Sequence, residues 1–173
     1  VSAMRSASDK PRMLLQMSAV GYYGMENDEA LGEDAPPGSD FLANVCISWE
    51  ESTSQAESMG IRRVVVRPGV VLSRKGGILP MILLPFRFFI GGPLGNGQQG
   101  FPWIHIADQI SAMRFLIEDP QARGAYNLTA PQMLTNAEFG RIVGHVMRRP
   151  AAFPTPGFAL RMIMGEKASL VLH

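Results

Sequence analysis

Three polar side chains that could transfer a proton lie close together near the start of the sequence: Ser18, Tyr22 and Tyr23. The run from residue 12 to residue 20 is mainly apolar and ends before Gly21, which predicts a buried strand. Ligands of open α/β sheets bind at the carboxyl ends of the strands. Ser18 is therefore a candidate catalytic and cofactor-binding residue, and a serine satisfied by backbone groups at a strand end is an equal alternative.

The two tyrosines follow Ser18 within one turn of chain. A phenol can act as a general acid or base, so Tyr22 and Tyr23 are candidate catalytic residues. The alternative, which we favour for half-buried tyrosines, is that one ring packs in the core while the other hydroxyl bonds to the backbone.

A second segment with potential chemistry begins at the end of another apolar run. Residues 61–67 are rich in β-branched side chains and predict a second buried strand, which Pro68 and Gly69 break. Arg67 at its end could bind a phosphate, but pairing with an acidic side chain is the simpler expectation.

Residues 95–100 match the pattern G-x-G-x-x-G. Such a turn binds a pyrophosphate only when a strand precedes it and a helix follows it. Here Gly-Gly-Pro precedes the pattern at 91–93, and the following residues 101–106 are predicted to be extended. We therefore interpret 95–100 as a flexible loop at the rim of a substrate cleft and not as a cofactor turn.

A helix is predicted after residue 38, because Ser39 or Asp40 can cap it and Gly60 can end it. Its apolar side chains fall on one helical face. These are Phe41, Leu42, Val45, Cys46 and Trp49.

The rest of the sequence alternates between predicted helices and strands, which favours a parallel α/β sheet. In order, we expect a partly helical segment within 76–90, a helix opened by Asp108, a strand at 124–128, a helix after a capping box of Thr135 and Glu138, a proline-stiffened connection, and a last helix over 158–172.

The composition suits a globular domain and excludes several functional classes. Apolar residues make up 46% of the 173 residues and charged residues 18%, which indicates a hydrophobic core. The net charge of +1 argues against nucleic acid or an anionic membrane as a partner. The single cysteine, Cys46, fits a reducing compartment, so we expect a cytoplasmic protein in which this thiol is buried and structural.

Several segments, taken in order, resemble one known family. They are Ser18–Gly24, Asp40–Ala43 with Trp49-Glu50, Arg67–Leu72 with Gly76-Gly77, Gly91–Gly97, Trp103–Asp108, Asn127–Pro131, Thr135-Asn136, Glu138-Phe139, Arg149-Pro150 and Gly165-Glu166. Each motif is weak alone, but their ordered combination resembles the atypical extended short-chain dehydrogenase/reductases of the NAD-dependent epimerase/dehydratase-like group.

The resemblance implies a Rossmann-like, doubly wound parallel sheet with a small C-terminal helical region on the substrate side. Family members begin with a strand and a glycine turn that binds NAD or NADP, and this turn is not in the sequence. We therefore expect a C-terminal portion that lacks roughly 100 residues of the cofactor-binding half. Residues 1–75 would complete that domain, and 76–173 would form the substrate-side region, with the strand at 124–128 returning to the sheet.

The resemblance also implies site residues and partners. Pro68, Gly69 and Val70 would lie beside the nicotinamide, with Ser18 and Arg67 as further cofactor contacts. The substrate side would be formed by Gly97, Gln99, Trp103 and His105. NAD or NADP, with a slight preference for NADP, would bind only to the intact protein, and a small molecule would be the substrate, with a homodimer as one option.

Some features of these residues have simpler interpretations. A lone histidine is more often structural, and His105 has no second ligand at metal spacing, so we expect no metal site. Asp108 is most simply a helix cap.

The Tyr-x-x-x-Lys pair of the family is absent, since Phe41 and Val45 stand near its expected place. We predict an NAD(P)-binding oxidoreductase or epimerase-like protein, in the class of epimerases, dehydratases and reductases, acting on a small sugar-like or nucleotide-linked substrate. The missing pair favours an alternative, a non-catalytic cofactor-binding or regulatory protein. The chain alone would lack activity and would expose the edge of its first strand.

Overall fold

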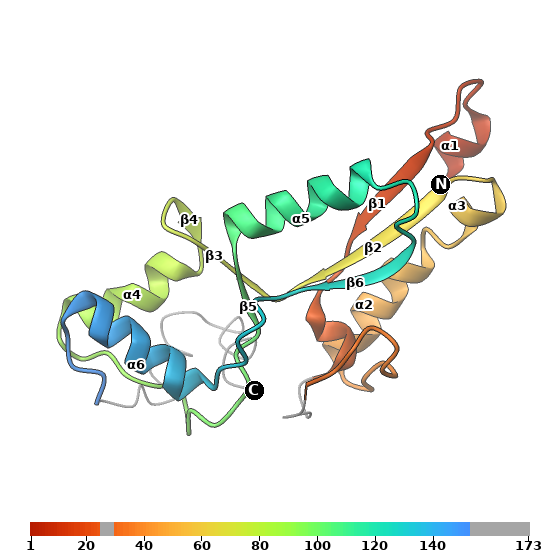
Figure 1. Cartoon of the computed structure of the whole chain (residues 1–173). Helices are drawn as coiled ribbons and strands as arrows, with labels where there is room; N and C mark the ends of the chain where they lie inside the picture. The colour runs from red at the N-terminus through yellow and green to blue at the C-terminus, as the bar shows by residue number, and fades with distance from the viewer. Residues whose placement is uncertain (25–29, 153–173) are drawn as a thin grey trace. The chain divides into compact units, whose positions relative to one another are not determined.

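The computed structural model describes residues 1–24 and 30–152 (Figure 1). The chain forms two compact units. Unit 1 comprises Val1–Gly69 and Ile104–Thr129, and unit 2 comprises Val70–Trp103 and Ala130–His173. The helix expected over 158–172 and the Gly165-Glu166 motif lie outside the described residues.

Unit 1 is built on a parallel sheet of three strands, β1 (Met13–Met17), β2 (Arg62–Pro68) and β6 (Gly124–Leu128), in the order β1-β2-β6. The prediction of three parallel strands is confirmed. Val64, Val65 and Val66 of the central strand are almost completely buried, as expected for a strand covered on both faces.

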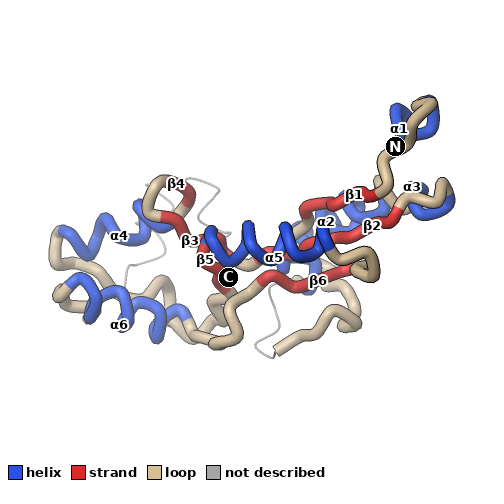
Figure 2. The backbone as a smooth tube through the Cα atoms, turned by 45° about the horizontal axis from the view of Figure 1, so that its top comes forward, coloured by secondary structure: helices blue, strands red, loops and turns tan. Residues whose placement is uncertain are grey.

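Two helices cover opposite faces of this sheet, α2 (Phe41–Glu51) and α5 (Ile106–Glu118) (Figures 1 and 2). Both crossovers step across the sheet in the same direction, from β1 to β2 and from β2 to β6. Because their helices lie on opposite faces, the two crossovers have opposite hands. Crossovers between parallel strands are right-handed in about 98% of cases, so one of the two is of the rare kind.

The face that α2 turns to the sheet differs from the predicted one. Asp40 caps the helix by accepting a hydrogen bond from the backbone N–H of Ala43 at 2.8 Å, as expected. Ala43 and Cys46 are buried, whereas Phe41 is 79% exposed and Trp49 52% exposed. The assignment of Phe41 and Trp49 to the buried stripe was therefore wrong, because small side chains let α2 approach the sheet closely.

The cap of α5 also differs from the prediction. The helix begins at Ile106, and the imidazole Nδ1 of His105 accepts the N–H of Ala107 at 3.3 Å. Asp108 lies inside the first turn, where its negative charge suits the positive end of the helix dipole. The remaining short helices of unit 1 are α1 (Ser2–Ser6), η1 (Val20–Tyr23) and α3 (Gln55–Ser58).

A second sheet has the order β4-β3-β5, with β3 (Val70–Ser73) and β4 (Gly76–Gly77) antiparallel, and β5 (Trp103–His105) beginning in unit 2. This sheet contains two short strands, β3 and β4, that the sequence pattern did not indicate, whereas its third strand, β5, lies within the segment 101–106 that was predicted to be extended. The described part of unit 2 also contains the helices α4 (Leu79–Arg87), which lies within the segment predicted to be partly helical, and α6 (Asn136–Met147).

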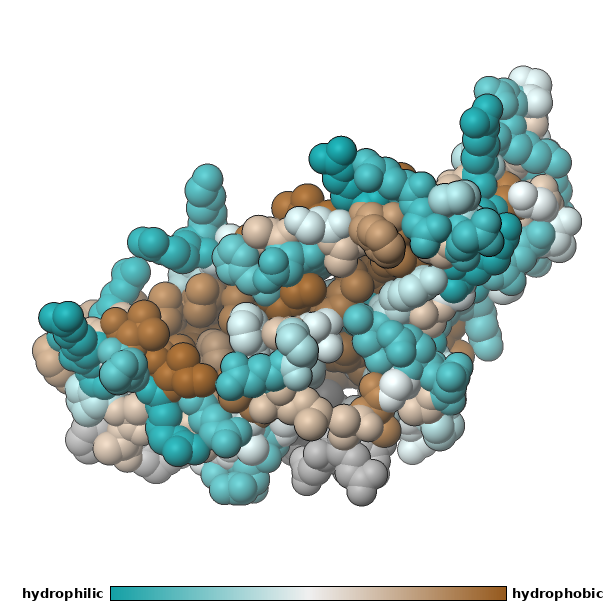
Figure 3. Space-filling view, in the orientation of Figure 1, coloured by the Kyte–Doolittle hydropathy of each residue, from teal (hydrophilic) through white to brown (hydrophobic). Residues whose placement is uncertain are grey.

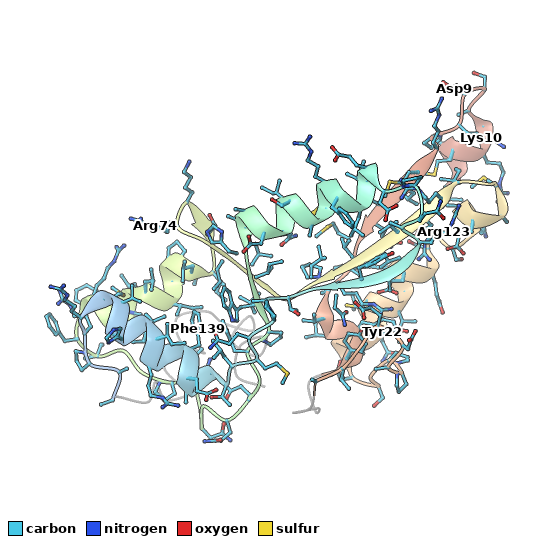
Figure 4. All side chains as sticks on the ribbon, viewed as in Figure 1. Asp9, Lys10, Tyr22, Arg74, Arg123 and Phe139 are labelled. Atoms are coloured by element: carbon cyan, nitrogen blue, oxygen red, sulfur yellow. The ribbon has the colours of Figure 1, made fainter. Side chains whose placement is uncertain are left out.

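The core of unit 2 lies between its two helices and β3. It consists of Leu72, Phe86, Phe101, Phe139 and Val143. The rings of Phe101 and Phe139 stack with centroids 4.3 Å apart (Phe139 is labelled in Figure 4). Figure 3 also shows apolar residues on the outer surface of α4 and α6, where Leu84 is 49% exposed and Val146 74% exposed.

No helix in the described ranges is long and apolar enough to cross a membrane.

The predicted capping box opens α6. The Thr135 hydroxyl accepts the N–H of Glu138 at 3.2 Å, and the Glu138 carboxylate accepts the N–H of Thr135 at 2.8 Å. Hydrogen bonds from the backbone and hydroxyl of Thr135 hold the pKa of Glu138 below its ordinary value. Both orphan donors at the helix start are thus satisfied.

We expect Thr135→Ala to lower the free energy of unfolding by about 1 kcal/mol, because it removes the side-chain cap of α6. The measurement is the urea unfolding midpoint. The exposed Ser111 of α5 provides a control, since Ser111→Ala should change stability by no more than about 0.5 kcal/mol. Equal shifts in the two variants would contradict the role of the cap.

Candidate functional site

A buried ion pair lies where β2 ends in unit 1. The guanidinium of Arg67 donates through Nε to Oε1 of Glu50 at 2.9 Å and through Nη2 to Oε2 at 2.8 Å. The side chains are only 5% and 13% exposed, respectively. This two-pronged geometry is the strongest arrangement for an arginine and a carboxylate. The expectation that Arg67 pairs with an acid is confirmed.

The third guanidinium nitrogen of Arg67 connects the pair to Tyr23 and β6. Nη1 donates to the Tyr23 hydroxyl at 2.8 Å, and that hydroxyl donates to Oδ1 of Asn127 at 2.8 Å. The same Nη1 lies 3.3 Å from the carbonyl oxygen of Glu33. Tyr23 is thus both an acceptor and a donor within one buried network, which joins the ends of β1, β2 and β6.

Tyr22 has a different environment from its neighbour. Its ring (Tyr22 is labelled in Figure 4) lies against the Arg67 guanidinium, with Cζ of Arg67 3.5 Å from the ring centroid, and is nearly perpendicular to the Tyr23 ring, with centroids 5.3 Å apart. The side chain is half-buried, whereas Tyr23 is 5% exposed. Within the described ranges the Tyr22 hydroxyl makes no hydrogen bond.

Two glycines, Gly24 and Gly38, allow the backbone after the two tyrosines to pack against itself. η1 ends at Gly24, whose φ is +80°, a value that favours glycine. The N–H of Gly38 donates to the carbonyl of Tyr22 at 2.9 Å, and a Cβ on Gly38 would lie only 2.6 Å from the Cα of Gly24. This close approach holds η1 against the return of the loop and fixes the two rings.

Each side chain of the ion pair stabilises the charged form of the other. Burial raises the pKa of Glu50, but the hydrogen bonds and charge of Arg67, with the neighbouring Ser18 hydroxyl, outweigh it and hold the pKa below its ordinary value. Burial lowers the pKa of Arg67, yet its bonds to Glu50 and Tyr23 raise it above the ordinary value overall. Both groups therefore stay charged at neutral pH.

Ser18 lies at the end of β1, as predicted, and its N–H donates to the carbonyl of Val66 at 2.7 Å. The residue is 6% exposed, and its hydroxyl lies beside Cys46 and Glu50 of α2. It makes no hydrogen bond of normal geometry to any residue that the structure describes. Because Oγ is shielded beneath α2, this arrangement argues against direct contact with a substrate.

Cys46 is buried, as predicted. Burial raises the pKa of its thiol, and the negative charge of Glu50 adds to this effect, although Ser18 opposes it. A thiol in this setting is protonated and weakly nucleophilic.

The residues expected beside a nicotinamide lie at the junction of the units. Pro68 is buried at the end of β2, and Gly69 donates its N–H to the carbonyl of Leu128 at 3.1 Å within unit 1. Val70 begins unit 2, where its N–H donates to the carbonyl of Pro102 at 2.7 Å. Both backbone N–H groups are therefore used by the protein itself.

The glycine pattern at 95–100 has neither a strand before it nor a helix after it, since α4 precedes it and β5 follows. Gly97 has φ +72°, and a Cβ there would lie 2.8 Å and 2.9 Å from the Cβ atoms of Pro93 and Ala137. The predicted local context, with no strand directly before the pattern and no helix directly after it, is confirmed. At Gly97 the loop packs closely against Pro93 and the start of α6.

The other residues expected on the substrate side are divided between the units. Gln99 donates through Nε2 to the carbonyl of Leu94 at 3.1 Å, and Trp103 packs on the core of unit 2. Oε1 of Gln99 and Nε1 of Trp103 are buried and have no hydrogen-bond partner in the described part of the chain. His105 is exposed and caps α5 in unit 1. In the same part of the chain no three His, Cys, Asp or Glu side chains could hold a metal ion.

Sequence reasoning missed Glu50 and Asn127 as members of the site. Glu50 follows Ala43 and Cys46 by seven and four positions on the face that α2 turns to the sheet. An acid on a buried helical face needs a cationic partner, so this position was the available signal. Asn127 carried no comparable signal, because its role depends on the register between β2 and β6, in which it pairs with Arg67.

The chain was compared with known proteins in sequence and in structure. No family model matches the chain. It is 40% identical over 167 residues to the chloroplastic epimerase family protein SDR39U1 homolog of Arabidopsis thaliana, covering 96% of this chain and 48% of that protein. It is 37% identical over 170 residues to the epimerase family protein YfhF of Bacillus subtilis, covering 98% of this chain and 56% of that protein.

Over nearly its whole length the chain is similar to proteins named as epimerase family proteins. Among solved structures, the human epimerase family protein SDR39U1 with NADPH matches with a TM-score of 0.90 at 35% identity, over 99% of this chain and 58% of that one. A nucleoside-diphosphate sugar epimerase from Corynebacterium glutamicum matches with a TM-score of 0.71 at 32% identity, over 92% of this chain and 35% of that one. The Rossmann-type α/β fold is thereby confirmed, and the chain spans about half the length of the curated relatives it matches.

We expect Glu50→Gln to destabilise the protein by about 3 kcal/mol, because it leaves the Arg67 cation buried without its counter-charge. The urea unfolding midpoint measures this. Glu118 offers a matched control, since its ion pair with Arg114 is exposed, with side chains 62% and 77% accessible. Glu118→Gln should cost no more than about 0.5 kcal/mol. A loss of similar size in both variants would rule out a special role for the buried pair.

The same pair predicts a dependence of stability on pH. The pKa of Glu50 is lower in the folded protein than in the unfolded chain, where it is about 4.3. Its contribution is therefore complete above that value and is lost as the pH falls through the lowered folded pKa. In urea unfolding at a series of acidic pH values, the wild type should lose more stability over this window than Glu50→Gln. Parallel pH profiles would contradict this assignment.

Proposed function

We propose that this chain forms part of an NAD(P)-binding oxidoreductase or epimerase-like protein that acts on a small sugar-like or nucleotide-linked substrate. The observation that carries the proposal is the match over 99% of the chain, at 35% identity, to a human epimerase family protein solved with NADPH. A relative at 32% identity that is described as a nucleoside-diphosphate sugar epimerase supports the substrate class.

The described residues fit one part of such a cofactor and not another. The only G-x-G-x-x-G pattern of the sequence cannot cradle a pyrophosphate, because Pro93 and Ala137 fill the space at Gly97. Arg67 is committed to Glu50 and Tyr23, which opposes the earlier expectation that it contacts the cofactor directly. The end of β2 remains suitable for a nicotinamide, since ligands of this fold bind beyond the carboxyl ends of the strands.

In this proposal the bound nicotinamide would give or take a hydride at a carbon of the substrate. The residues of this chain would hold the substrate oxygen and move its proton. Pro68, Gly69 and Val70 would border the ring. The pyrophosphate would be held by residues outside this sequence, and NADP would be preferred to NAD.

The proposal predicts that full-length protein containing this chain binds NADPH, and NADH more weakly. A titration that follows nicotinamide fluorescence should saturate below millimolar concentration. We expect Gln98→Glu to leave the affinity unchanged, because this exposed position lies in a loop that holds no phosphate. A charge placed beside a bound pyrophosphate would weaken binding by repulsion. Absence of any signal with millimolar NADPH and NADH would refute the proposed function.

A further inference from the structure

The two adjacent tyrosines at the end of β1 are chemically unequal, and this difference assigns a role to each. We propose that Tyr22 is the group that exchanges a proton with the substrate, and that Tyr23 and Arg67 are positioning residues for it. This inference rests on the proposed function, and it replaces the missing Tyr-x-x-x-Lys pair with groups from different elements.

Tyr23 cannot readily serve as the proton donor, because its hydroxyl is already used in both directions. It accepts from Arg67 and donates to Asn127, each at 2.8 Å, and the residue is 5% exposed. Passing its proton to a ligand would break the bond to Asn127 and leave a buried acceptor unsatisfied. The Tyr23 hydroxyl instead helps to hold the Arg67 guanidinium over the ring of Tyr22.

Tyr22 meets the requirements that Tyr23 fails. Its side chain is half-buried, and its hydroxyl makes no hydrogen bond within the described ranges, so the proton is not committed. The ring lies at the carboxyl edge of the sheet, the usual ligand edge of this fold. It contacts the Arg67 guanidinium, whose Cζ lies 3.5 Å from the ring centroid, and the Tyr23 ring, which is nearly perpendicular to it; both contacts limit the loss of rotational freedom when a ligand binds.

Arg67 takes the electrostatic part that a lysine would have. When Tyr22 gives its proton to a substrate carbonyl oxygen, the O–H bond breaks and its electron pair stays on the phenolate. The reduced nicotinamide, when bound, would supply a hydride to the carbonyl carbon, and the C=O π pair would move to the oxygen that takes the proton. A fixed cation over the ring stabilises the phenolate until water returns the proton. Glu50 keeps that cation in place through its two hydrogen bonds.

Nitration with tetranitromethane tests this assignment without knowledge of the substrate. In full-length protein we expect Tyr22 to be modified several-fold faster than Tyr23, because Tyr23 is buried. Saturating NADPH should protect Tyr22 and leave the modification of Tyr126 unchanged. Tyr126 is a suitable internal control, since it is partly buried and, within the described residues, its hydroxyl accepts one hydrogen bond, from the N–H of Arg123 at 3.3 Å. Peptide mass mapping gives the extent at each position.

Two variants complete the test. Tyr22→Phe should bind NADPH with the affinity of the wild type, whereas Tyr23→Phe should lower the urea unfolding midpoint and still show protection of Tyr22. If NADPH binds but Tyr22 is modified equally with and without it, the assignment fails and the proposed function stands. If NADPH does not bind at all, the proposed function fails and this inference falls with it.

Discussion

The ion pair between Arg67 and Glu50 is the interaction on which the end of the parallel sheet depends. Two charges shielded from solvent are costly unless their geometry and remaining hydrogen bonds are nearly complete. Here all three terminal groups of the guanidinium are used, two by Glu50 and one by Tyr23. Helix α2, strand β2 and the 3-10 turn after β1 therefore cannot shift independently without leaving a buried charge unpaired.

The same constraint explains why this edge is polar although the middle of the central strand is apolar. Val64, Val65 and Val66 of β2 contribute hydrophobic burial, and the polar groups begin one residue later, at Arg67. Burying an arginine at this place weakens the hydrophobic core locally. In return it supplies a fixed, solvent-shielded cation over an aromatic ring, which a mobile surface lysine could not provide.

Local sequence signals predicted the features that are stabilised locally. The strand at 124–128, the Asp40 cap of α2 and the capping box of Thr135 and Glu138 were all foreseen, since each depends on residues close in sequence. The exposure of Phe41, the cap by His105 and the short strands β3 and β4 were not foreseen. These features depend on which side chains tertiary packing admits, and strands of two to four residues carry too little periodicity to identify.

For the candidate site the same distinction holds at the level of single residues. The sequence marked Ser18, Tyr22, Tyr23 and Arg67 as polar groups at strand ends, but it could not separate their roles. Ser18 turns its hydroxyl beneath α2, and Tyr23 enters the buried network, because the strand register brings Asn127 opposite Arg67. The roles of adjacent tyrosines are thus decided by a contact more than a hundred residues away in sequence, between Tyr23 and Asn127.

The carboxyl ends of β2 and β6 are also the places where the chain leaves unit 1. In unit 1 the chain leaves the sheet at the carboxyl ends of two neighbouring strands, at Gly69 after β2 and at Thr129 after β6, and both exits lead into unit 2. The N–H of Gly69 bonds to the carbonyl of Leu128, so the two exits are joined. A change that displaced the end of β2 would therefore disturb both exits together. Because Arg67 lies two residues before Gly69, the buried ion pair stabilises the end of β2 from which the chain leaves unit 1, as well as the tyrosines.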